Sequence, residues 1–221
     1  MNKKTWPRKE AIAVFNEHTE EYDRWYHEKP GASLYEAEVK AVKALISGGS
    51  GLEVGVGTGI FASRLNVQIG VDPAQNMLRI AKKRGVDVIQ GTAEFLPIRD
   101  KSFDYVLSIL TICFLEDIDS AFREAWRVLR YGGSAIICFI PRDSYLGSLY
   151  LRKKAEGHKF YKYANLYAKE EVEKLLYEAN FQITENATTL SESGLETKGE
   201  ESYNNVITHG FVCIKAKKIQ D

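Results

Sequence analysis

The sequence predicts an α/β protein built on one doubly wound, mostly parallel, seven-stranded sheet that ends in an antiparallel hairpin. Two observations carry this prediction. Between about residues 51 and 140, short apolar runs alternate with amphipathic segments, which is typical of a parallel sheet with helices on both faces. Near the C-terminal end, two apolar runs follow each other with only a polar connection between them, which indicates a hairpin.

Two helices are expected ahead of the first strand. The first covers residues 7–28, where Pro7 suits a first helical turn and aromatic residues recur every three or four positions. A second helix is expected from Ser33, which makes a capping-box pattern with Glu36, to the stop at residues 47–49. The stripe of the first helix consists of Phe15, His18, Tyr22, Trp25 and Tyr26.

The alternating region contains five apolar runs short enough to be buried strands. They lie near residues 51–55, 68–72, 86–90, 103–110 and 134–140, with helices near 58–65, 74–84 and 118–130. After Pro141 the pattern loosens until a helix near 169–179, and the hairpin strands are expected near 181–190 and 206–216. No repeat or linker interrupts the chain, so residues 1–221 are expected to form a single domain.

Composition restricts the classes of partner. A chain of 221 residues is long enough for a domain that buries about 70% of its unfolded surface. Its 30 basic and 30 acidic residues leave no basic footprint, which argues against a nucleic-acid partner. The small clusters at residues 152–154 and 215–218 are expected to be solvated faces. The longest apolar stretch, near residues 105–115, is too short for a membrane span, and a cytoplasmic location is expected.

The cysteines predict neither a disulfide nor a metal site. Cys113, Cys138 and Cys213 are an odd number and have no C-x-x-C spacing. Each lies in an apolar run, so each is expected to be a buried, reduced thiol.

The most informative segment is Leu52-Glu53-Val54-Gly55-Val56-Gly57-Thr58-Gly59, followed by Asp72 at the end of the next apolar run. Glycines at this spacing let the backbone turn tightly and let a ligand lie against bare main chain. An acid at the tip of the adjacent strand can accept hydrogen bonds from a ribose diol. The pattern therefore suits an adenosine-containing cofactor. A dinucleotide fingerprint would place its third glycine at Ile60, so a nicotinamide-dependent dehydrogenase is disfavoured.

This turn resembles motif I of the class I S-adenosylmethionine (SAM)-dependent methyltransferases. The resemblance continues in order through Gly91-Thr92-Ala93-Glu94-Phe95-Leu96-Pro97, Ser102-Phe103-Asp104-Tyr105-Val106 and Arg127-Val128-Leu129-Arg130-Tyr131-Gly132-Gly133. It covers about residues 20–182 and is closest to the small-molecule (type 11) branch that includes quinone-biosynthesis methyltransferases. It implies a Rossmann-like fold, SAM as cofactor, S-adenosylhomocysteine as product, and transfer of a methyl group to a small-molecule acceptor.

The resemblance also implies a cofactor site at the carboxyl ends of the strands. Asp72 would bind the ribose, Glu53 would anchor the glycine turn and the methionine end, and Met77 would lie against the adenine. Many relatives carry an Asp where Thr92 stands, so the residue that reads the adenine, Thr92 or Glu94, is left open. The complete expected site is Tyr22, Glu53, Gly55, Gly57, Thr58, Gly59, Asp72, Pro73, Met77, Thr92, Ala93, Glu94 and Ile109.

Two segments are expected to cover the pocket. Residues 1–47 would form an N-terminal helical lid, and in relatives an aromatic residue from this region closes over SAM, which makes Tyr22 the candidate here. Residues 142–168 would form a substrate cap whose aromatic side chains could hold an apolar or cationic acceptor. These are Tyr145, Tyr150, Phe160, Tyr161, Tyr163 and Tyr167.

Methyl transfer from a sulfonium depends on positioning and on the exclusion of water, so no catalytic residue is assigned. A base is needed only for an acceptor that arrives protonated, and His18, His27, His158 and His209 have no partner recognisable in the sequence. Two alternatives remain open: methylation of RNA or protein, and a SAM-binding sensor without turnover. The acceptor, its accepting atom and the oligomeric state are also open.

Overall fold

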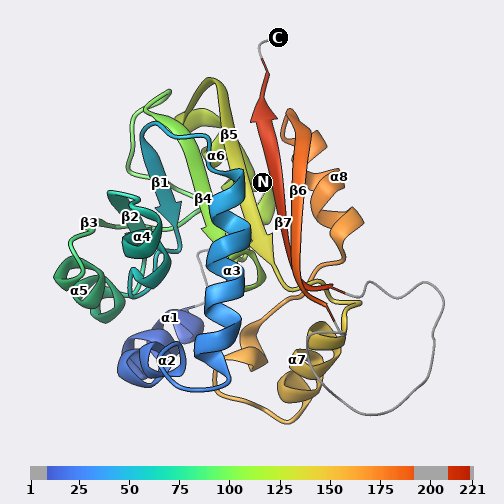
Figure 1. Ribbon diagram of the computed structural model, residues 1–221. Helices are drawn as coiled ribbons and strands as arrows, with labels where there is room; N and C mark the ends of the chain where they lie inside the picture. The colour runs from blue at the N-terminus through green and yellow to red at the C-terminus, as the bar shows by residue number, and fades with distance from the viewer. Residues whose placement is uncertain (1–8, 192–208, 220–221) are drawn as a thin grey trace, which may run out of the picture.

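A computed structural model describes residues 9–191 and 209–219 (Figure 1). Its seven strands form one sheet in the order β3-β2-β1-β4-β5-β7-β6. Strands β3 to β5 are parallel, and β7 runs antiparallel between β5 and β6. The predicted fold class is therefore confirmed. The strands are β1 Gly51–Val54, β2 Ile69–Asp72, β3 Asp87–Gln90, β4 Phe103–Ile109, β5 Leu129–Phe139, β6 Phe181–Ser191 and β7 His209–Lys218.

Helices cover both faces of the sheet. One hydrophobic core packs α6 and α8 against the sheet, and a second packs α3, α4 and α5 against the opposite face. Figure 1 shows α1, α2 and α7 beyond the end of the sheet toward which β1 points. The helices are α1 Lys9–Glu17, α2 Thr19–Trp25, α3 Gly31–Leu45, α4 Ile60–Leu65, α5 Gln75–Lys83, α6 Ile118–Val128, α7 Tyr145–Ala155 and α8 Lys169–Glu178, with 3-10 turns η1 Ile112–Phe114 and η2 Tyr161–Tyr163.

The strand order places a crevice beside β1. The chain proceeds from β1 to β2 and β3 on one side, and then returns to β4 on the other side. Ligands of open α/β sheets bind at such a reversal, at the carboxyl ends of the strands. The loop that leaves β1 there has φ values of 75° at Gly55, 53° at Gly57 and 72° at Gly59, which favour glycine.

The prediction of one N-terminal helix over residues 7–28 is wrong. The described part contains two helices, α1 and α2, that meet at His18, where φ is −108° and ψ is 28°. The Thr19 hydroxyl donates hydrogen bonds to the carbonyl oxygens of Phe15 (2.7 Å) and Asn16 (3.1 Å). Because this side chain competes for carbonyls of the last turn, it helps to end α1 there. Pro7 lies outside the described residues.

Two other boundaries also differ from the predictions. Helix α3 begins at Gly31, so Ser33 lies inside its first turn and does not cap it. Helix α7 falls in a region where the sequence pattern was too loose to predict any element. There the Ser144 hydroxyl accepts a hydrogen bond from the backbone N–H of Gly147 at 3.0 Å and caps the helix.

The prediction of three reduced thiols is wrong for two of them. Cys138 on β5 and Cys213 on β7 are register partners with a Cα–Cα distance of 4.1 Å, and they form a disulfide. The residues are 75 positions apart in the sequence, and only the insertion of β7 beside β5 brings them together. Cys113 is free, and burial raises the pKa of its thiol to about 12.

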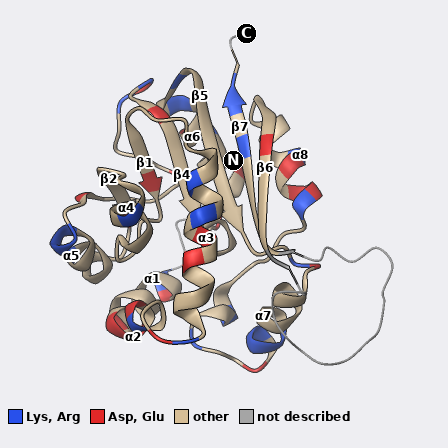
Figure 2. Ribbon diagram, in the orientation of Figure 1, with Lys and Arg blue, Asp and Glu red and all other residues tan. Residues whose placement is uncertain are grey.

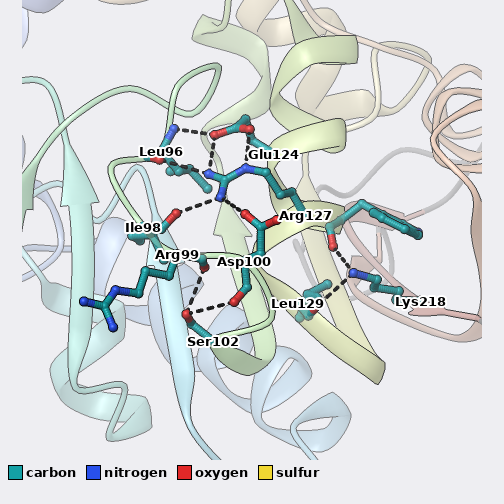
Figure 3. Close-up of polar contacts among 10 residues, drawn as sticks. Leu96, Ile98, Arg99, Asp100, Ser102, Glu124, Arg127, Leu129 and Lys218 are labelled. Carbon is teal, nitrogen blue, oxygen red and sulfur yellow. Dashed lines mark hydrogen bonds and ion pairs between the residues drawn. The ribbon is translucent and has the colours of Figure 1, made fainter.

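The cluster at residues 215–218 is not the solvated face that the sequence predicted. Lys218 is 1% exposed, and its Nζ donates to the carbonyl oxygens of Trp126 and Leu129, each at 2.8 Å (Figure 3). The same Nζ lies 3.7 Å from the centroid of the Trp126 ring. Lys215 is also buried and pairs with Glu185. A buried ammonium needs such partners because it has lost its hydration.

A charged clamp fixes the loop between β3 and β4 to α6 (Figure 3). The Arg127 guanidinium donates to both carboxylate oxygens of Glu124, at 2.7 and 2.8 Å. It also donates to the carbonyl oxygens of Leu96 (3.0 Å) and Ile98 (2.7 Å) and to Asp100 Oδ1 (2.6 Å). The planar fork of five donors makes this set of contacts specific to arginine. The clamp therefore positions the chain immediately after the predicted adenine contacts.

Acidic and basic residues occur together on α1, α2, α3, α6 and α8, whereas α4, α5 and α7 carry only basic residues (Figure 2). Among residues 9–191 and 209–219, no helix is both long enough and apolar enough to cross a bilayer. The same residues contain no group of three or more His, Cys, Asp or Glu side chains arranged to hold a metal ion.

We expect Arg127→Ala to lower the free energy of unfolding by about 1–3 kcal/mol, because it removes charge-assisted hydrogen bonds and leaves the Leu96 and Ile98 carbonyls without this donor. Arg127→Lys should recover only part of the loss, because an ammonium cannot reproduce the fork. Urea titration followed by circular dichroism measures both effects. Arg123→Ala, also on α6, is the control, since this side chain is exposed and donates a hydrogen bond to Ser120, which lies on the same helix. Equal urea midpoints for Arg127→Ala and Arg123→Ala would contradict the clamp.

Candidate functional site

A cavity of about 110 Å³ lies at the carboxyl ends of the central strands. Its walls come from the glycine turn after β1, the tip of β2, the turn after β3, the end of β4 and the N-terminal helices. Segments that are distant in the sequence thus meet where the strand order predicts a ligand site. The predicted cofactor residues that line it are Tyr22, Gly55, Gly57, Asp72, Pro73, Met77, Thr92, Ala93, Glu94 and Ile109.

The other three predicted residues lie behind this wall and support it. Glu53 is 1% exposed within β1, and burial together with the nearby Asp72 carboxylate raises its pKa well above the usual value. The Thr58 carbonyl accepts a hydrogen bond from Arg84 at 2.7 Å. A Cβ on Gly59 would lie 2.8 Å from the Ala81 Cβ, so this glycine permits α4 and α5 to pack closely.

Asp72 ties the glycine turn to the tip of β2. Its Oδ2 accepts from the Gly57 N–H at 2.9 Å, and its Oδ1 accepts from the Ala74 N–H at 2.8 Å. Burial raises the pKa of this carboxyl to about 6, against the opposing effect of the two backbone donors. An ionised carboxylate can accept about four hydrogen bonds. Two backbone donors therefore leave Asp72 able to accept more from a ligand in the cavity.

Glu94 has a buried oxygen that no described residue satisfies. The side chain is 3% exposed, and its Oε1 accepts from the Glu116 N–H at 3.2 Å. Its Oε2 has no hydrogen-bond partner among the described residues, although Glu94 lines the cavity. A buried acceptor without a donor carries a desolvation cost, so a ligand N–H would stabilise it. Thr92 also lines the cavity and forms a β-bridge with Phe95.

The sequence predictions missed several residues of the cavity wall. Thr111 could have been predicted from its position, since it lies just beyond the carboxyl end of β4, where ligands bind in such sheets. Its hydroxyl donates to the Ile109 carbonyl at 3.0 Å, and a Cβ on Gly55 would lie 2.3 Å from its side chain. This close approach explains why a glycine stands at position 55. The missed residues are Ala11, Ile12, Phe15, Val71, Ala74, Gly91, Leu110, Thr111, Phe114 and Leu115.

A second cavity of about 320 Å³ adjoins the first. It lies among α2, α3, α7 and the segment after α7, and about half of its wall residues are aromatic. Four of the six aromatic residues of the predicted cap segment line this cavity, whereas Tyr145 and Tyr163 do not. The aromatic lining is Phe15, Tyr22, Trp25, Tyr26, Phe114, Phe139, Tyr150, Phe160, Tyr161 and Tyr167.

Tyr22 stands at the boundary between the two cavities. It lines both, as do Phe15, Leu110 and Phe114. Its hydroxyl lies 2.9 Å from the Tyr26 hydroxyl, and its ring meets the Phe160 ring edge-on at 5.9 Å between centroids. Burial raises the pKa of Tyr22 above its usual value, so the phenol is neutral at physiological pH. The side chain thus provides a hydrogen-bonded aromatic partition.

About a third of the wall of the second cavity is polar or charged, and Glu38 in it is 2% exposed. These wall residues are Glu21, Arg24, Glu28, Glu38, Cys113, Lys153 and His158. Burial and the charges of Lys153 and Lys159 lower the pKa of His158, which favours its neutral form. Because burial raises the pKa of Cys113, its thiol is protonated at neutral pH.

The other histidines considered as candidate bases are not observed in the cavity walls. His18 and His27 lie outside the walls of both cavities. The side chain of His209 is outside the described part of the structure.

The N-terminal helices are fixed to the sheet domain by polar contacts. Arg84 donates to both carboxylate oxygens of Asp23, at 2.7 and 2.8 Å. Asn16 accepts from the Asn76 backbone N–H at 2.8 Å and, through its carbonyl, from the Asn76 side chain at 2.9 Å. These contacts hold α1 and α2 beside α5 and across the first cavity.

Comparison with known proteins extends these observations. A family model described as a methyltransferase domain matches residues 52–137, from β1 into β5. An uncharacterized protein of Methanocaldococcus jannaschii is 41% identical over 206 residues, which cover 93% of this chain and 99% of that protein.

Two further relatives have named activities. The demethylmenaquinone methyltransferase of Roseiflexus castenholzii is 37% identical over 113 residues, and the match spans about half of each protein, 46% of this chain and 47% of that one. The expected similarity to the quinone-biosynthesis branch is confirmed over this half. A crystal structure from Thermotoga maritima, described as a SAM-dependent methyltransferase and possible histamine N-methyltransferase, has a TM-score of 0.83 and 38% identity.

The match to the Thermotoga maritima structure covers 94% of this chain and 99% of that one. Three findings indicate a methyltransferase that uses SAM as its cofactor. They are the fold, the matched methyltransferase domain and this full-length similarity. The chain belongs to the class I SAM-dependent methyltransferases.

Proposed function

We propose that the protein transfers a methyl group from SAM, held in the first cavity, to a small molecule held in the second. The observation that carries this proposal is the shared wall: Phe15, Tyr22, Leu110 and Phe114 line both cavities. The second cavity, at about 320 Å³, has a volume within the range of small-molecule sites. Acceptor and cofactor would therefore meet at this wall.

The first cavity fits the cofactor by its chemistry. We assign the ribose hydroxyls to Asp72, which retains acceptor capacity beyond its two backbone partners. The unpartnered Oε2 of Glu94 favours this residue over Thr92 as acceptor for the adenine amino group. Met77, 2% exposed, would pack against the adenine ring. At Gly57 a Cβ would meet no atom nearer than Tyr22 Cε1 at 4.0 Å, so bare main chain faces open space there.

The cofactor supplies a methyl group on a positively charged sulfur, which leaves as S-adenosylhomocysteine when the acceptor displaces it. The chain contributes by binding, by alignment of the acceptor for in-line displacement, and by exclusion of water. We assign the exclusion of water to residues 1–47, with Tyr22 and Phe15 at the shared wall, and to residues 142–168 around the second cavity. No side chain is required to form a covalent bond.

Enclosure and charge support a small acceptor over RNA or protein. The second cavity is bounded by α2, α3 and α7, and about half of its wall residues are aromatic. Figure 2 shows acidic and basic residues together on α2 and α3 and basic residues on α7. The 30 basic and 30 acidic residues of the chain balance, whereas a nucleic-acid partner usually requires a basic excess. A SAM-binding sensor differs only in the absence of turnover. The cytoplasmic location stays a prediction.

The test is release of S-adenosylhomocysteine from the full chain. SAM would be offered with a fraction of cell extract below about 1 kDa, with total RNA, or with extract protein. We expect turnover with the small-molecule fraction alone. Turnover only with RNA or protein would overturn the acceptor class, and SAM binding without turnover in any fraction would favour the sensor.

We expect Asp72→Ala and Glu94→Ala each to weaken SAM binding by roughly 10-fold or more. Each removes a charged acceptor, and hydrogen bonds to charged groups contribute about 1.5–3 kcal/mol. Isothermal titration calorimetry measures the dissociation constants. Asp87→Ala is the matched control, because that aspartate is exposed on β3 and lines neither cavity. Wild-type affinity in both site variants would show that the cofactor site has been misplaced.

The affinity for SAM should fall as the pH decreases through about 6. Burial places the pKa of Asp72 there in the ligand-free protein, and ribose hydroxyls donate to the ionised carboxylate. Affinity should therefore be nearly constant from pH 7 to 8 and decrease by up to about 10-fold per pH unit below 6. The same titrations on Asp72→Asn should show a much smaller slope. An equal slope in both proteins would assign the titration to another group, such as Glu53.

Tyr22→Ala should accelerate dissociation of S-adenosylhomocysteine by roughly 10-fold or more, because it opens the partition between the cavities to water. Tyr22→Phe keeps the ring and should dissociate at nearly the wild-type rate. Stopped-flow displacement measures these rates, and Tyr177→Ala, on an exposed tyrosine of α8, is the control. A large drop in melting temperature together with an unchanged dissociation rate would make Tyr22 a packing residue and contradict its role at the lid.

A further inference from the structure

Glu38 is a buried carboxylate that faces the second cavity without a cation. It lies in the middle of α3, is 2% exposed, and forms part of the cavity wall. Its Oε2 has no hydrogen-bond partner, and no Lys, Arg or His among the described residues forms an ion pair with it. Burial alone raises the pKa of this carboxyl to about 8.

Electron-rich rings line the same cavity as this carboxyl group. Tyr22 of α2, Tyr26 just after α2 and Tyr150 of α7 all belong to the cavity wall. Burial raises the pKa of each of these phenols, and the nearby Glu38 adds to the effect. Tyr22 and Tyr26 meet edge-on at 5.4 Å between centroids, and Tyr150 stacks on Tyr161 at 4.3 Å. Aromatic faces attract organic cations, and the attraction is stronger where water is excluded.

The wall already holds one cation against these rings. Lys153 Nζ lies 5.4 Å from the Tyr150 centroid and 5.6 Å from the Tyr161 centroid. This ammonium lies over the rings and forms no ion pair with Glu38. The lowered pKa of His158 means that this residue adds no positive charge to repel a second cation at neutral pH.

We propose that the methyl acceptor is a small organic amine, bound as its ammonium against the Glu38 carboxylate among the rings of Tyr22, Tyr26 and Tyr150. This inference rests on the proposed function and specifies the acceptor class for the same cavity. An ammonium would form a charge-assisted hydrogen bond with Oε2 and lie against the rings. Burial favours the protonated form of this carboxyl in the protein alone. An ammonium would offset the cost of ionising it, which a neutral or anionic acceptor would not do.

The Glu38 carboxylate can also act as the general base that accepts the proton that the amine must lose. The N–H bond breaks, an O–H bond forms on Glu38, and the electron pair stays on nitrogen. That pair then forms the new N–C bond with the methyl carbon, while the electrons of the C–S bond return to sulfur and give S-adenosylhomocysteine. Glu38 loses its proton to water after the methylated ammonium leaves.

Binding, measured apart from turnover, tests this proposal. The full chain with saturating S-adenosylhomocysteine would be titrated with amines, each paired with the alcohol of the same skeleton, such as phenethylamine with 2-phenylethanol and cyclohexylamine with cyclohexanol. We expect the amines to bind at least about 10-fold more tightly than their alcohols. Glu38→Gln should weaken amine binding by about 10- to 100-fold and leave alcohol binding nearly unchanged.

Glu36→Gln is the matched control, because Glu36 lies on the same helix, is exposed and pairs with Arg64. Its amine affinities should equal those of the wild type. The proposal is overturned if the alcohols bind as tightly as the amines, or if Glu38→Gln retains wild-type amine affinity. The affinity of the wild type for S-adenosylhomocysteine distinguishes failure of the proposed function from failure of this inference. If the wild type does not bind S-adenosylhomocysteine, the proposed function is wrong. If it binds S-adenosylhomocysteine but shows no preference for amines, only this inference is wrong.

Discussion

The structure depends on the hydrogen bonds that the Asp72 carboxylate accepts from the N–H groups of Gly57 and Ala74. These bonds join the turn after β1 to the turn after β2, at the reversal of strand order where the crevice opens. The left-handed φ values of the glycine turn bring bare main chain to the same place. One carboxylate therefore organises the backbone around the cofactor cavity and also presents its remaining acceptor capacity to the ligand.

The acceptor cavity is built differently, from helices added at the end of the sheet. Arg84 with Asp23, and Asn76 with Asn16, hold α1 and α2 beside α5, so that Tyr22 forms a partition between the two cavities. This division accounts for a sequence that indicates the cofactor clearly and the acceptor hardly at all.

Local patterns predicted most of the sheet and about half of the residues that line the first cavity, because strand–helix alternation and the glycine turn are properties of contiguous residues. Several features that the sequence did not predict depend on chain segments that meet only after folding. Cys138 and Cys213 pair because β7 inserts beside β5, and Lys218 is buried because α6 and β5 cover it. Glu38 belongs to the same group, since nothing in α3 alone shows that aromatic residues from α2 and α7 enclose it.

A crystal structure of the full chain with S-adenosylhomocysteine would test the central claim most directly, namely that one crevice aligns the cofactor with an adjoining acceptor cavity. The account predicts the ribose hydroxyls within hydrogen-bond distance of Asp72, the adenine amino group on Glu94, and the sulfur directed past Tyr22 toward the second cavity. A cofactor bound elsewhere, or one whose sulfur faces away from that cavity, would contradict it.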